Sequence, residues 1–138
     1  MSNSIIRSAL ESRLKTWADS QVPPIPIAYQ NVPFTPPAGR YIRAYLLPAE
    51  TSSRLVEGTD RSYIGMFQMS VCVPDGTGPG ASEQIVASLE TLFSSPLTIS
   101  KSGLNIRITR PLSVSPAMQE HGLYVIPTRT QYRVDKTI

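Results

Sequence analysis

The sequence has few of the residues that carry most enzyme chemistry, since its 138 residues include one cysteine, Cys72, and one histidine, His121. A single cysteine cannot form an internal disulfide, so we expect the chain to fold in a reducing environment. One Cys and one His also fall short of the ligands of a zinc site. A serine nucleophile would need His121 as its base, and the G-x-S-x-G motif does not occur. The sequence therefore predicts no catalytic residues and no metal site.

Charged residues are also sparse: they make up 17% of the chain, below the roughly 25% of an average soluble domain, and the net charge is +3. Such a low density is typical of a surface that a partner covers. Ten of the 13 basic residues are Arg, which is favoured in protein interfaces and on nucleic acid, although a genomic preference for Arg would give the same ratio. No stretch approaches the roughly 20 apolar residues of a membrane span, so we expect no membrane partner.

The stretch PDGTGPGASEQ, residues 74–84, has the strand, glycine loop and helix layout of a phosphate-binding turn. A Walker loop needs Lys followed by Ser or Thr after its last glycine, and here Gly80 is followed by Ala-Ser-Glu. Glu83 would stand in the first helical turn, where it competes with an anionic ligand. We therefore expect no nucleotide or other cofactor, and we interpret the glycines as a turn between a strand and a helix.

Hydrophobic periodicity predicts a single domain over residues 1–138 with an α+β fold. The expected helices are 3–18 and 79–94, an extended piece is 25–30, and the expected strands are 40–48, 62–74, 103–111 and 121–134. Since helices and strands do not alternate regularly, this order favours a mainly antiparallel sheet with two helices packed on one face. Pro127 within the last expected strand predicts a bulge or an edge position.

Two groups of residues are candidates for contacts with other molecules. Tyr41, Arg43 and Tyr45 share one face of the expected strand 40–48. Such a face could stack nucleic-acid bases, but the small charge excess favours a protein interface. The polar loop 49–61 mixes charges around an apolar pair, which is typical of a docking arm, and a solvated surface loop has similar weight. The arm residues are Arg54, Leu55, Val56, Glu57, Asp60 and Arg61.

The succession IPIAYQNVPFTPPAGRYIRAYLLPAETSSRLVEGTDRSYIGMFQMSVCVPDGTGPGASEQI, with VSPAMQEHGLYVIPTRTQYR near the end, resembles a family of small proteins of tailed phages and prophages. The chain is similar in layout to the tail terminators of long-tailed, lambda-like phages. These shared motifs are turns and strand ends, so they point to a family and supply no catalytic residues.

The resemblance implies an α+β subunit that forms a hexameric ring with copies of itself. Such a ring caps the tail tube protein, stops tube growth, and presents a surface to the head connector, and DNA would pass through its lumen. The implied location is the bacterial host cytoplasm during assembly and then the virion tail. A head–tail joining, neck or other tail-completion protein is the nearest alternative. A nucleic-acid-binding module that uses Tyr41, Arg43 and Tyr45 is less favoured.

Overall fold

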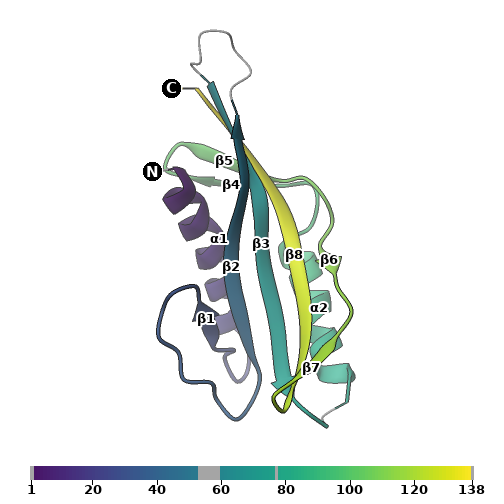
Figure 1. Ribbon diagram of the computed structural model, residues 1–138. Coiled ribbons are helices and arrows are strands. Elements are labelled where there is room, and N and C mark those ends of the chain that lie inside the picture. The colour runs from purple at the N-terminus through teal and green to yellow at the C-terminus, as the bar shows by residue number, and fades with distance from the viewer. Residues whose placement is uncertain (1, 53–59, 77, 138) are drawn as a thin grey trace.

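The computed structural model describes residues 2–52, 60–76 and 78–137, which form two helices and one eight-stranded sheet (Figure 1). The helices are α1 (Ser2–Asp19) and α2 (Gly80–Leu92). The strands are β1 (Ile27–Tyr29), β2 (Tyr41–Ser52), β3 (Asp60–Pro74), β4 (Leu97–Lys101), β5 (Leu104–Ile108), β6 (Ser113–Val114), β7 (Met118–Glu120) and β8 (Leu123–Thr137). The predicted α+β class is therefore confirmed.

Both predicted helices form because their apolar residues recur at helical spacing. In α1, the buried side chains of Ile6, Leu10 and Leu14 follow one another at intervals of four residues. In α2, Ile85 and Leu89 are the corresponding buried pair. Each helix consequently has one apolar side that must pack against something.

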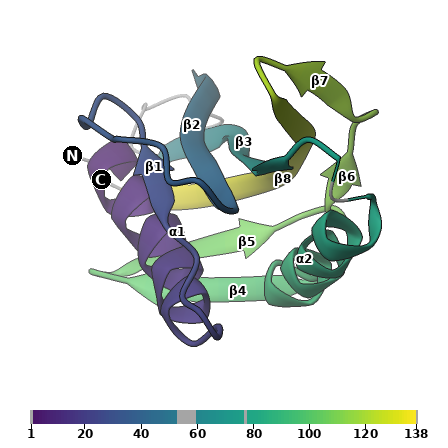
Figure 2. The same cartoon turned by 90° about the horizontal axis from the view of Figure 1, so that it is seen from below.

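The sheet supplies that partner. Its strand order is β1-β2-β3-β8-β5-β4. The pairings between the described strands are antiparallel, except that β1 is parallel to β2. Figure 2 shows that the sheet curls, so that β4 and β5 lie across from β2 and β3, with α1 and α2 at the two sides. One core cluster joins side chains of both helices to the inner face of the sheet. The expectation of two helices on one face is confirmed.

β8 is the strand on which the rest of the sheet depends. On one side it pairs with β3 along its whole length, and on the other side it pairs in turn with β7, β6 and β5. The predicted edge position of Pro127 is wrong, because Pro127 lies in this central strand and the register with β3 is continuous there. An irregularity of the kind predicted is present on its other side, where the register shifts by one residue between the pairings with β6 and β7. The Pro127 carbonyl accepts the Ser115 N–H at 2.9 Å, so its missing N–H would face the connection between β6 and β7 and not β3.

Two other boundaries differ from the sequence prediction. The expected loop 49–61 is too long, because β2 continues to Ser52 and β3 begins at Asp60, with a register shift between Pro48 and Glu50. The short strands β4, β6 and β7 are not predicted at all. The glycine stretch is a turn as expected, with Gly76 and Gly78 at φ of 82° and 79°, in the left-handed region that glycine favours.

Candidate interaction face

The sheet has an outer face, which we define as the side of β2, β3 and β8 opposite the helices. Side chains alternate along a strand, so the residues between the buried core positions point outward. Cross-strand pairing aligns them in rows across the three strands. The outer face comprises Tyr41, Arg43, Tyr45 and Leu47 of β2, Ile64, Met66, Gln68, Ser70 and Cys72 of β3, and Val125, Arg129, Gln131 and Arg133 of β8.

At one end this face is closed by the chain itself. Phe34, in the proline-rich segment before β2, lies with its ring centroid 5.3 Å from that of Tyr41. Tyr41, Cys72 and Val125 form a second buried cluster, and Tyr41 is only 3% exposed. Burial raises the pKa of the Cys72 thiol, which favours the neutral form. Tyr41 is therefore a packing residue within this chain and is not open for base stacking.

Arg43 is half-buried beside the same cluster. Its Nη2 donates to the Tyr41 hydroxyl at 3.4 Å, and its Nη1 lies 3.5 Å from the Glu120 carboxylate. The hydrogen bond to Tyr41 is the main cause that raises the pKa of Arg43, so the guanidinium is charged. Because Arg43 already has an acidic partner, it has less capacity left for an external anion than the sequence suggests.

The middle of the outer face is open, and we call it the central patch: Tyr45, Leu47, Met66, Gln68, Arg129 and Gln131. Tyr45 is opposite Gln68, which is opposite Arg129, and Leu47, Met66 and Gln131 form the next row. Leu47 is 43% exposed although it is a large apolar residue. A mixture of aromatic, Met and Arg side chains is the composition of protein interfaces. Of these six residues, the sequence analysis identified Tyr45 alone.

The central patch borders a cleft of about 140 Å³ that contains two arginines. Met66, Arg110, Pro111, Ser113, Arg129 and Gln131 line this cleft. Arg110 and Arg129 are exposed. Arg129 Nη1 donates a hydrogen bond to the Ser115 hydroxyl at 3.4 Å. Arg107 and Arg133, farther along the face, both contact the Asp135 carboxylate, to which the Ser62 hydroxyl also donates at 2.6 Å. Asp135 therefore offsets part of the positive charge of Arg107 and Arg133, whereas neither cleft arginine has an acidic partner among the described residues.

The predicted arm falls largely outside the described residues, since Arg54, Leu55, Val56 and Glu57 are among residues 53–59. Asp60 and Arg61 belong to β3, opposite Thr137 and Lys136 of β8. Figure 1 shows the ends of β2, β3 and β8 continuing as a stem past the helices. The proposed contacts of the arm stay a prediction.

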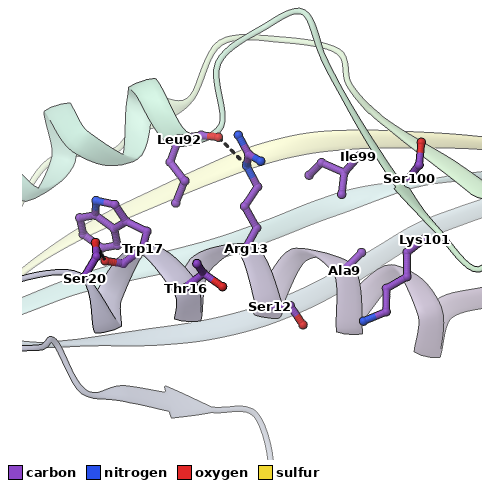
Figure 3. A pocket seen from close by; sticks show the side chains of 10 residues that line it. All are labelled: Ala9, Ser12, Arg13, Thr16, Trp17, Ser20, Leu92, Ile99, Ser100 and Lys101. Carbon is purple, nitrogen blue, oxygen red and sulfur yellow. Dashed lines mark hydrogen bonds between the residues drawn. The ribbon is translucent and has the colours of Figure 1, made fainter.

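A larger hollow lies elsewhere, between α1, β4 and the end of α2, and has a volume of about 610 Å³ (Figure 3). Arg13 crosses it and donates through Nε to the Leu92 carbonyl oxygen at 2.8 Å, which ties α1 to α2. At the other end Lys101 Nζ donates to the Ser8 hydroxyl at 2.7 Å. Its described lining includes no acid, histidine or cysteine, so it offers no acid–base pair.

Two observations, both limited to the described residues, concern a metal site and a membrane span. No group of three or more His, Cys, Asp or Glu residues is placed there to hold a metal ion. No helix in this part of the chain is long and apolar enough to cross a membrane.

The fold defines a class of protein, a small α+β protein with one sheet face that the described chain leaves partly open. A family model described as "Phage tail terminator protein" matches residues 5–132, from α1 to near the end of β8. The chain therefore belongs to the phage tail terminator protein family and is a phage tail structural protein.

Solved structures share this fold. One is 41% identical, covers 97% of this chain and 96% of its own, and superposes with a TM-score of 0.84. Another, from the structure described as "Virion of native gene transfer agent (GTA) particle", is 20% identical, covers 97% of both chains and has a TM-score of 0.65. At that identity the likeness is one of fold. None of the curated proteins compared with the chain matches it.

Proposed function

We propose that this protein assembles into a ring, a hexamer, that caps the tail tube, ends tube growth and provides the surface to which the head connector attaches. The observation that carries the proposal is the family match over residues 5–132. Assembly would take place in the bacterial host cytoplasm, and the ring would remain in the virion tail. DNA would pass through its lumen on the way out of the head.

The fold supports this role because a ring subunit needs two different contact surfaces, one for each neighbour. The central patch supplies an open, mixed apolar and basic surface on one side of the sheet. The exposed side of α2 is a second surface, and Figure 2 shows α2 across the molecule from α1. Tyr45 belongs to the central patch, Arg43 is in the neighbouring row of the same strand, and Tyr41 would contribute through its packing against Arg43. The arm, residues 54–61, would reach a neighbouring subunit or the tube.

Electron microscopy of tails made without this protein tests the proposal. We expect tube lengths to become uncontrolled, and a supplied wild-type copy to restore a single length. Tails of normal length without heads would instead support the alternative, a head–tail joining or neck protein. Normal tails with heads attached would contradict both roles.

The nucleic-acid reading has little structural support. Tyr41 is buried, and Arg43 is engaged with Tyr41 and Glu120, so the three-residue platform is not open. A protein that stays monomeric and binds duplex DNA with a steep salt dependence would revive it. Light scattering with a DNA-binding titration separates the two readings.

A further inference from the structure

Arg110 and Arg129 differ from the other arginines of the outer face in having no acidic partner among the described residues. Arg43 contacts Glu120, and Arg107 and Arg133 contact Asp135. Within the described part of the chain, neither cleft arginine forms an ion pair. Both line the cleft of about 140 Å³. Two like charges that share a cleft repel each other, so an anion placed between them would be bound favourably.

The chemistry of the cleft fits a carboxylate on a protein. A guanidinium presents a planar pair of N–H donors that matches the two oxygens of a carboxylate. Gln131 and Ser113 add polar groups at the wall, and Met66 and Pro111 add apolar ones. The cleft opens beside the exposed Leu47, an apolar neighbour that suits a protein partner better than a phosphate backbone.

The chain carries a matching pair of acids on α2. Glu83 and Glu90 are exposed, and neither forms an ion pair with another described residue. They are seven residues apart, which places them on one side of the helix about 10 Å from each other. The buried residues Ile85 and Leu89 face the core, and Glu83 and Glu90 lie together on an exposed flank of α2, which Figure 2 shows on the opposite side of the molecule from α1.

We infer that Arg110 and Arg129 of one copy bind Glu83 and Glu90 on α2 of the next copy. This inference rests on the proposed ring and names the two surfaces that form its subunit contact. The contact is head to tail: each copy offers its cleft to one neighbour and its α2 acids to the other. Such a contact repeats around a closed ring without a second kind of interface.

Charge reversal tests the pairing. We expect R110E with R129E, and separately E83K with E90K, to raise the concentration at which rings form by about tenfold or more, because like charges would then face each other. The four substitutions combined in one chain should restore the ring. An equal mixture of the two double variants should also restore it, because alternating copies then present opposite charges at every contact. Native mass spectrometry gives the ring populations, and tails made with each variant are counted by electron microscopy.

The control is R7E with K15E on α1, which makes the same change in net charge as the arginine reversal, at two i,i+4 ion pairs along one helix. We expect this control to form rings as the wild type does. If wild-type rings form, in solution or on tails, and withstand both reversals, the inference fails and the proposed ring stands. Failure of both rescues also overturns it. Rings that survive R110E with R129E but no longer bind duplex DNA would assign the cleft to phosphate. A wild type that forms no ring even on tails would overturn the proposed function itself.

Discussion

Gly65 lies in β3 opposite Tyr132 of β8, where the absence of a side chain makes room for the Tyr132 ring. A Cβ at this position would be 2.5 Å from the Tyr132 hydroxyl and 2.7 Å from the Leu47 carbonyl oxygen. The Tyr132 ring is fully buried, and the Leu47 oxygen belongs to the backbone of a paired strand. Neither neighbour can move without disturbing the sheet.

We therefore predict that Gly65→Ala lowers the free energy of unfolding by about 1–3 kcal/mol, the cost of overpacking a core. Urea denaturation measures this change. Gly39→Ala is the matched control, because nothing lies within 4 Å of its added Cβ, and it should leave stability nearly unchanged. Equal stability of the two variants would show that β3 and β8 have more room than the structure indicates.

The Tyr132 hydroxyl is buried without a hydrogen-bond partner among the described residues. We predict that Tyr132→Phe is neutral or raises stability by up to about 1 kcal/mol, because it removes an unsatisfied polar group. Burial raises the pKa of Tyr132, so the folded chain holds the phenol proton more tightly than the unfolded chain. The wild type should then lose stability relative to the variant as the pH rises above about 10. Urea titrations at neutral and alkaline pH check both, and a variant clearly less stable at pH 7 would contradict the prediction.

At the scale of elements, the segment between β1 and β2 is attached to the outer face through Phe34, which covers Tyr41 and the buried Cys72. We predict that Phe34→Ala destabilises the protein by about 2 kcal/mol, less than truncation of a fully buried Phe. It should also make the Cys72 thiol react several-fold faster with an aromatic disulfide reagent. Val32→Ala is the control from the same segment, since Val32 is 54% exposed. Unchanged thiol reactivity in Phe34→Ala would mean that another group shields Cys72.

The elements that the sequence predicts are those with a strong repeat of their own. Apolar alternation in β5 and helical spacing in α1 identify their buried sides without any knowledge of neighbours. β4 is as long as β5 and also alternates, with Leu97 and Ile99 on its more buried side, so this strand could have been predicted. β6 and β7 have two and three residues and no such repeat, and they exist because β8 offers them a partner. Pro127 misleads for a related reason. Its nitrogen, which carries no hydrogen, faces the irregular connection between β6 and β7 and not the strand β3.

The candidate contact surface was predictable only in part. Alternation along β2 places Tyr45 on the outer face, and the same alternation in β8 could have identified Arg129. Arg110 gives no local signal, because it follows β5 in an irregular segment. It meets Arg129 through tertiary structure alone, since both line one cleft.

At the scale of the whole molecule, β2, β3 and β8 extend past the helices as a stem (Figure 1), and residues 53–59 are the segment of the sequence between β2 and β3. We predict that replacing these seven residues by Gly and Ser, at constant length, changes the free energy of unfolding by less than about 1 kcal/mol. The reason is that the two core clusters of the described chain are built from other residues. The same replacement should abolish attachment to tails. Circular dichroism and electron microscopy give the two measurements. Normal attachment would remove the arm from the proposed contacts.

The central position of β8 has a consequence for the order of events during synthesis. Every other strand of the fold is made before β8, yet β3 and β5 are joined only through it. Contacts between residues so distant in sequence form slowly, and the chain cannot complete its sheet until β8 has left the ribosome. The outer face, which needs β8 for Arg129 and Gln131, therefore does not exist on an unfinished chain. Synthesis itself would delay assembly until β8 of each copy has been made and has paired with β3.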